Sequence, residues 1–257
     1  MTACHPTEFH KKHRKPPESF SISLNGVTLE RAGVTKFLGV VIQENREWNP
    51  HIEYICNKVS GANGILAKLK YYVPKYVLCT IYNSLCMSHI SYAMIVLASS
   101  YKSSIKILEI LLKKGIRHVC NGKYNCHTDP LFKECKILIF DDLRKINSVK
   151  IMYKKTQGKI HKYHSSKLKL KSEISNIKTR HMHDDLITGN KHTDLYKINS
   201  LNYKVATAWN ELPLSLKETS SFSISTFTKH TKCLYLSNYS NSHKYGNNNC
   251  YICKDLN

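Results

Sequence analysis

The spacing of apolar residues changes near residue 50 of the chain. Before that point, residues 20–42 alternate apolar and polar side chains around Asn25-Gly26 and end in a continuous apolar run at 37–42. Alternation about an Asn-Gly pair predicts a β-hairpin. A short apolar run containing β-branched residues predicts a strand buried on both faces. We therefore expect a hairpin and one further strand in this part of the chain.

After residue 50, apolar residues recur at the spacing of amphipathic helices. Asn49 is a favoured N-cap residue and Pro50 fits the first helical position, so a helix is expected to run to residue 72. Further helices are expected from Pro74, over 104–120 and 130–135, from Asp141 as N-cap to Gly158, and within 203–236. The expected fold is mainly α with a small N-terminal antiparallel β element (α+β), the helices forming a bundle with short connections.

Composition and hydropathy divide the chain into six segments. They are a basic polar segment at 1–19, the β element at 20–48, the helical bundle at 49–158, a basic linker at 159–200, a structured C-terminal segment at 201–237 and a disordered tail at 238–257.

The charge balance points to a polyanionic partner. The chain of 257 residues has 39 Lys and Arg against 18 Asp and Glu, a net charge of +21. Nucleic acid is the commonest partner of such a basic protein. The alternative is a lysine-rich composition that reflects an A/T-biased genome, because Asn, Ile and Tyr are abundant too.

Neither the N-terminus nor the cysteines indicate export. The first residues lack the apolar core of a signal peptide, and several of the ten cysteines lie within helical patterns. We expect a reducing compartment, the nucleus or cytoplasm.

Residues 76–101 contain no charged side chain and are long enough to cross a bilayer. Polar residues interrupt this stretch, so a core helix and no membrane partner are expected; these residues are Asn83, Ser84, Ser88, His89 and Ser91.

A series of short motifs resembles the reverse transcriptases of non-LTR (LINE-type, jockey-like) retrotransposons. The first is Lys36-Phe37-Leu38-Gly39-Val40, followed by Trp48-Asn49 and His51-Ile52. Those after it, in the order of the family, are residues 56–74, Tyr82-Asn83-Ser84-Leu85, Ser91-Tyr92, the paired-lysine helix with Arg117, residues 124–132, Thr179-Arg180-His181, and residues 208–213 with Leu216 and Phe227. The resemblance covers residues 10 to 237.

The resemblance implies that residues 20–48 form the edge of a polymerase palm and that a thumb follows. Phe37, Leu38 and Gly39 would form an element like the primer grip, in which Gly39 allows close approach of the backbone. It also implies that RNA or an RNA–DNA hybrid is the partner. The residues expected to contact it are Lys36, Phe37, Leu38, Gly39, Lys58, Lys68, Lys70, Lys113, Lys114 and Arg117.

The family's catalytic carboxylates have no counterpart here. Nucleotidyl transfer in the complete family enzyme uses Mg²⁺ held by aspartates of two palm strands, yet Glu8, Glu18 and Glu30 are the only acidic residues before position 40. Asp141-Asp142 is interpreted as the start of a helix and Asp184-Asp185 as solvated loop residues. No catalytic residue, metal site or cofactor is therefore expected in this chain.

A zinc site is the remaining metal hypothesis. Cys250 and Cys253 form a CxxC pair, with Cys233, His230 and His243 as candidate partners, and Cys4, His5, His10 and His13 form a looser group. One CxxC pair without a second is a weak signal, because a structural zinc ion needs four ligands.

The sequence thus predicts a truncated reverse transcriptase (RNA-directed DNA polymerase) that keeps the basic region contacting template and primer but is inactive alone. The missing palm and fingers would be a further partner. The alternative is a non-catalytic module, derived from a retrotransposon, that binds nucleic acid or protein.

Overall fold

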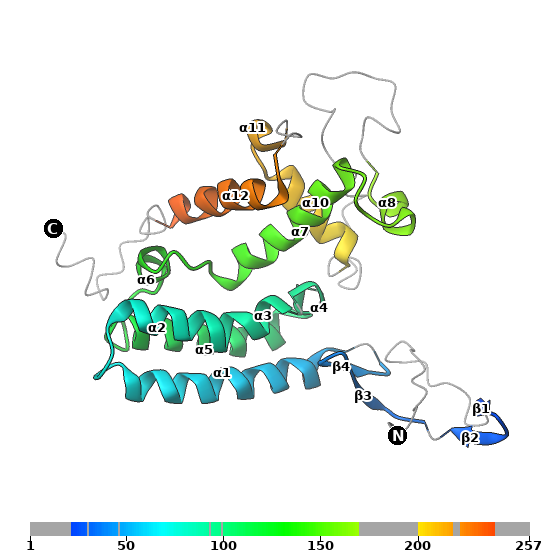
Figure 1. Cartoon of the computed structure of the whole chain (residues 1–257), viewed down its shortest axis with the longest axis horizontal. Coiled ribbons are helices and arrows are strands. Elements are labelled where there is room, and N and C mark those ends of the chain that lie inside the picture. The colour runs from blue at the N-terminus through cyan, green and yellow to red at the C-terminus, as the bar shows by residue number, and fades with distance from the viewer. Residues whose placement is uncertain are drawn as a thin grey trace.

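A computed structural model describes residues 22–29, 31–45, 47–92, 94–98, 100–169, 200–217 and 222–239. The segment at 1–19 and residues 240–257 of the expected tail lie outside this range. The structure is mainly helical, with a small antiparallel β element at its N-terminal end, and this confirms the expected α+β class (Figure 1).

Two separate hairpins make up the β element. β1 (Ile22–Leu24) pairs with β2 (Val27–Leu29) around Asn25 and Gly26, whose φ angles are +52° and +81°. Two successive positive φ angles are typical of a type I′ turn, which is the reason Asn-Gly predicts a hairpin. The first hairpin is confirmed.

The strand predicted over residues 37–42 is wrong, because the chain reverses within it. β3 (Val34–Phe37) pairs with β4 (Val40–Gln43), and Leu38 and Gly39 form the turn with φ angles of +46° and +80°. The side chains of Phe37 and Leu38 are 64% and 73% exposed, so the run is not buried on both faces. Glycine tolerates the left-handed conformation that this reversal requires.

The first helical layer contains two long parallel helices and a series of shorter helices that runs antiparallel to them (Figure 1). The Ser104 hydroxyl donates to Asn49 Oδ1 at 2.7 Å, and Asn63 Nδ2 donates to the Leu111 carbonyl at 2.8 Å, which fixes the parallel register. The elements are α1 (Asn49–Leu69), α2 (Lys75–Tyr82), η1 (Asn83–Met87), α3 (Ser88–Tyr92), α4 (Met94–Ala98) and α5 (Lys102–Val119).

Two predicted details of α1 are wrong. Trp48, and not Asn49, occupies the N-cap position without a capping side-chain bond, and the helix ends at Leu69 instead of residue 72. Asn49 lies in the first turn, where its side chain accepts the hydrogen bond from Ser104 of α5. A tertiary partner has therefore replaced the local capping bond that its residue type favours.

The uncharged stretch at 76–101 is divided between short elements of five to eight residues. Tyr82, Cys86, Ile90, Met94 and Leu97 are buried in the core. Across the part of the chain that the structure describes, no helix combines the length and the apolar character that a membrane span requires.

Helix α7 connects two hydrophobic clusters. Phe140 and Ile146 in its first half belong to the cluster of α1–α5, while Val149, Met152 and Tyr153 pack in a second cluster around Trp209. The remaining helices are α6 (Asp129–Glu134), α7 (Phe140–Thr156), α8 (Lys162–Lys167), α10 (Leu201–Asn210), α11 (Leu214–Lys217) and α12 (Ile224–Asn238). The expected bundle and the C-terminal segment thus share α7.

The structure differs from three further expectations, on the start of α7, the linker and the tail. Ile139, not Asp141, is the N-cap residue of α7, so Asp141 lies inside the first turn. The expected linker begins with helix α8, and Leu168 just after it is buried in the second cluster. Tyr239, assigned to the tail, is buried, and its hydroxyl oxygen accepts a hydrogen bond from the Ile139 backbone N–H at 2.9 Å.

Candidate nucleic-acid interface

Two lysines meet over one tyrosine where the second hairpin packs on α1. The Nζ atoms of Lys36 from β3 and Lys58 from α1 lie 4.8 and 5.8 Å from the centre of the Tyr54 ring. Both are within the range of a cation–π contact, which favours a cation over the ring face. Two of the predicted contact residues, 22 positions apart in the chain (58 minus 36), are thereby brought together.

A buried histidine holds the hairpin against α1. The Val41 N–H donates to Nδ1 of His51 at 3.3 Å, so Nδ1 must carry no proton. Burial lowers the pKa of His51 and favours this neutral form. The His51 ring also stacks on Tyr54, with ring centres 6.4 Å apart. His51 thus links β4 to the tyrosine beneath the two lysines.

The hairpin turn is fastened by a tyrosine of α3. The Tyr92 hydroxyl donates to the Leu38 carbonyl at 2.6 Å. A Cβ atom at Gly39 would lie 3.6 Å from Tyr92 Cε1, an ordinary contact, so close backbone approach is not what requires glycine here. Its φ of +80° is the requirement. The exposed Phe37 and Leu38 border an open groove of about 490 Å³ that Trp48 also lines.

A second basic group lies at the opposite end of the α1–α5 pair. Burial lowers the pKa of His118, and the positive charges of Lys70 and Lys114 lower it further, which indicates that both lysines lie close to it. Lys70 also lies 4.8 Å from the centre of the Tyr71 ring, and Lys68 is exposed in the last turn of α1. Since 12 residues of helix separate Lys58 from Lys70, the two groups are about 18 Å apart along α1.

The structure does not bring Lys113 and Arg117 into either group. Lys113 lies near the Glu109 carboxylate, whose pKa it lowers against the larger effect of burial. The Arg117 guanidinium donates through Nε and Nη2 to the Cys126 carbonyl, at 3.3 and 3.1 Å. Arg117 therefore fixes the loop after α5, a role that the helical pattern did not indicate.

A basic pocket between α5, α7 and α10 was not predicted as a site. Its volume is about 460 Å³, and its cations come from three helices; they are Lys102, Lys106, Arg144, Lys145 and Lys204. Burial lowers the pKa of Lys204 to about 8, with Arg144 and Lys102 adding to the effect. No local signal in the sequence reveals this pocket, because its residues are distant in the chain.

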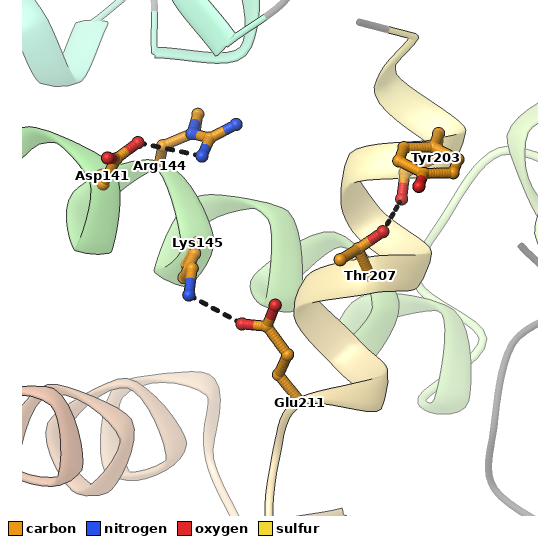
Figure 2. Close-up of polar contacts among 6 residues, drawn as sticks. All are labelled: Asp141, Arg144, Lys145, Tyr203, Thr207 and Glu211. Atoms are coloured by element: carbon orange, nitrogen blue, oxygen red, sulfur yellow. Dashed lines mark hydrogen bonds and ion pairs between the residues drawn. The ribbon is translucent and has the colours of Figure 1, made fainter. Parts of the chain in front are cut away.

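Carboxylates compensate much of the charge in this pocket. Arg144 Nη2 lies 2.9 Å from Asp141 Oδ1, and Lys145 Nζ lies 2.7 Å from Glu211 Oε2, as Figure 2 shows. The second pair joins α7 to α10. We therefore interpret these cations mainly as part of the contact between helices.

The acidic pair Asp141-Asp142 does not have the arrangement of a polymerase site. Both residues lie in the first turn of one helix, whereas metal-assisted transfer needs carboxylates on two strands. Asp141 pairs with Arg144, and burial raises the pKa of Asp142 against the opposing hydrogen bond from Tyr239. Asp184-Asp185 lies outside the described residues.

Most zinc candidates also lie outside the described residues: Cys250, Cys253, His243 and the group from Cys4 to His13. Cys233 and His230 lie on α12. Within the part of the chain that the structure describes, no three His, Cys, Asp or Glu side chains are arranged to hold a metal ion.

Comparisons with known proteins leave the family open. No family model, no curated protein and no solved structure matches the chain.

Proposed function

We propose that this chain corresponds to the end of the palm, the thumb and the C-terminal region of a non-LTR retrotransposon reverse transcriptase. In this proposal it binds RNA or an RNA–DNA hybrid and does not itself catalyse polymerisation. The succession of a hairpin, a long helix and a helical layer agrees with the palm edge and thumb that the motifs imply. The Lys36–Val40 motif forms a hairpin directly before α1.

The observation that carries the proposal is the lack of ion pairs at the lysines of β3 and of the α1–α5 layer within the part of the chain that the structure describes. Among the described residues, no carboxylate forms an ion pair with any of five lysines from the predicted set, which are Lys36, Lys58, Lys68, Lys70 and Lys114. Such cations can neutralise phosphates and release counterions, which gives affinity without reading sequence.

Binding to a labelled RNA–DNA hybrid over a range of salt concentrations tests the proposal. Exchanging Lys70 and Lys114 for Gln should lower the slope of log affinity against log salt by about 2, since two phosphate contacts are lost. The matched control exchanges Lys162 and Lys229, which are exposed on α8 and α12. Equal losses in the two double variants would contradict a specific interface.

A primer-extension assay tests the catalytic part. The purified chain, supplied with Mg²⁺, nucleotides and a primed RNA template, should extend no primer, because the described residues hold no pair of carboxylates from two strands. Sustained extension would refute this part of the proposal.

The second candidate is a non-catalytic module that binds a protein. The exposed Phe37 and Leu38 beside the groove at Trp48 favour it, because exposed apolar side chains at a groove are typical of protein interfaces. Under this alternative, hybrid binding would be weak and the Lys70 and Lys114 exchange would change it little. The salt titration therefore separates the two functions.

A further inference from the structure

Three cysteines meet at the end of the helical layer, near the loop that Arg117 fixes. Cys120 follows the last residue of α5, Cys135 follows the last residue of α6, and Cys79 lies in α2. The Sγ atoms of Cys120 and Cys135 are 3.4 Å apart, and Cys79 hydrogen-bonds to Cys135. All three residues are partly exposed to solvent.

A lysine distinguishes Cys120 from the other two cysteines. Lys75 lies one turn before Cys79 on α2, hydrogen-bonds to Cys120 and forms an ion pair with Glu134. An S–H donor and an ammonium beside the same sulfur both favour its thiolate. The pKa of Cys120 is lowered, chiefly by the hydrogen bond from Cys135 and then by the charge of Lys75. Burial and the charge of Glu134 oppose this effect. The pKa of Cys135 is raised.

We propose that Cys120 and Cys135 are a redox-active thiol pair that hydrogen peroxide converts into a reversible disulfide. The Cys120 thiolate attacks one peroxide oxygen; an S–O bond forms, the O–O bond breaks and hydroxide leaves, which takes a proton to become water. The Cys135 sulfur then attacks the sulfenic sulfur of Cys120. The S–S bond forms, the S–O bond breaks, and the oxygen leaves as water with the Cys135 proton. Two thiols and one peroxide give one disulfide and two waters.

The two sulfurs already lie in van der Waals contact. A disulfide needs its sulfurs about 2.05 Å apart, so the two atoms must approach by little more than 1 Å from their present contact. Each cysteine is the C-cap residue of its helix, so the small movement that closes the bond takes place at two helix ends. The bond would tie the end of α5 to the end of α6. This chemistry is independent of nucleic-acid binding.

The other described cysteines provide internal comparisons. Cys86 is buried, and burial raises its pKa to about 12, which makes it a poor nucleophile. Cys233 is exposed on α12, so it serves as the reference for the reactivity of a solvent-exposed thiol.

The test treats the reduced full chain with one equivalent of hydrogen peroxide and maps the products by mass spectrometry. The expected product is a linked pair of peptides containing Cys120 and Cys135, lighter by two hydrogen atoms and released by dithiothreitol. Formation at the rate of Cys233 oxidation, or a link between Cys79 and Cys135 instead, would overturn the assignment.

Three variants identify the roles. Cys135→Ser should leave Cys120 as a sulfenic acid that dimedone traps, whereas Cys79→Ser should still form the disulfide. Lys75→Gln should slow the reaction of Cys120 severalfold at pH 7 and should move the rate profile to higher pH, because the ammonium that favours the thiolate is lost. Lys75→Arg should restore the rate. A pH profile unchanged in Lys75→Gln, in a chain whose helical circular dichroism is intact, would show that Lys75 does not act on the thiolate.

Discussion

The lysines of the α1–α5 layer and those between α7 and α10 differ in what they contact. Lys36 and Lys58 lie over Tyr54, and no described carboxylate forms an ion pair with either. Lys145 and Arg144, by contrast, pair with Glu211 and Asp141 (Figure 2). A basic composition therefore serves two purposes here. Only cations left without carboxylates remain available for a polyanion.

The two regions also differ in how their helices are joined. In the α1–α5 layer the helices are close enough that Asn63 and Tyr82 donate hydrogen bonds to the carbonyls of Leu111 and Leu112, at 2.8 and 3.2 Å. Between α7 and α10, a partly exposed ion pair supplements the apolar contacts around Trp209. We expect tight packing in the first region to matter more for stability than the ion pair in the second.

The largest expected effect is at Gly115, where α1, α2 and α5 meet. A Cβ atom there would lie 2.5 Å from Asn63 Oδ1 and 2.7 Å from Tyr82 Cε2. Gly115→Ala should lower the free energy of unfolding by about 1–3 kcal/mol, because the core cannot accept the added carbon without moving. Urea unfolding measures this loss.

Gly61→Ala is the matched control in the same layer. Outside its chain neighbours and the nearby backbone of its own helix, no atom lies within 4 Å of a Cβ at Gly61, which is exposed on α1. This exchange should raise the free energy of unfolding by up to about 1 kcal/mol, since alanine favours helix. A loss at Gly61 as large as at Gly115 would contradict the packing argument.

An intermediate effect is expected from pH through His51. Its pKa is lowered in the folded chain, so the unfolded chain binds more protons as pH falls below its ordinary value near 6.5. The free energy of unfolding should therefore decrease with falling pH below about 6.5, by at most about 1.4 kcal/mol per pH unit for one proton. His118 changes stability in the same direction.

Urea unfolding at several pH values, in wild type and His51→Gln, isolates this contribution. The variant should show a shallower dependence on pH, because the titrating group is gone while His118 remains. The exposed His164 supplies the control exchange, which should leave the dependence unchanged. A steeper dependence in His51→Gln would reverse the assigned sign.

The smallest effect is expected at the pair between Lys145 and Glu211. Its side chains are 32% and 48% exposed, and such pairs contribute about 0.2–1 kcal/mol. A double-mutant cycle with Lys145→Gln and Glu211→Gln should give a coupling of this size at low salt and less at 1 M salt. If salt did not reduce the coupling energy, the pair would be shielded from solvent, which would contradict its partial exposure.

Sequence patterns predicted the helices well where the signal is local. The spacing of Ile105, Leu108, Leu111, Leu112, Ile116 and Val119 predicted α5; in the structure Leu111 is half-buried and the other five side chains are buried. The pattern was less informative for α1, where Ile65 fits it only loosely and is 46% exposed. Propensity alone also misplaced both N-caps: Asn49 lies in the first turn of α1 with a partner in α5, and Asp141 lies in the first turn of α7, paired with Arg144.

The candidate interface could be predicted only as a set of residues, not as an arrangement. Lysines at helical spacing on α1 and α5 were visible in the sequence, but nothing in it indicated that Lys36 would meet Lys58 or Lys70 would lie near Lys114. Arg117 was predicted to contact nucleic acid, but its guanidinium donates a hydrogen bond to the carbonyl of Cys126, nine residues further along the chain. Side-chain partners depend on distances between elements, which periodicity does not contain.

By itself, the sequence determined the α+β class, the first hairpin and the approximate helix positions, because these depend on hydrogen bonds and apolar spacing between residues close in the chain. Only the tertiary structure decided the reversal at Leu38 and Gly39, the sharing of α7 by two clusters and the contact between Cys120 and Cys135. The sharing of α7 comes from the burial of apolar surface between distant segments. The reversal is held by hydrogen bonds from Tyr92 to Leu38 and from Val41 to His51. The cysteine contact requires two helix ends to meet, so the spacing of neighbouring residues reveals none of the three.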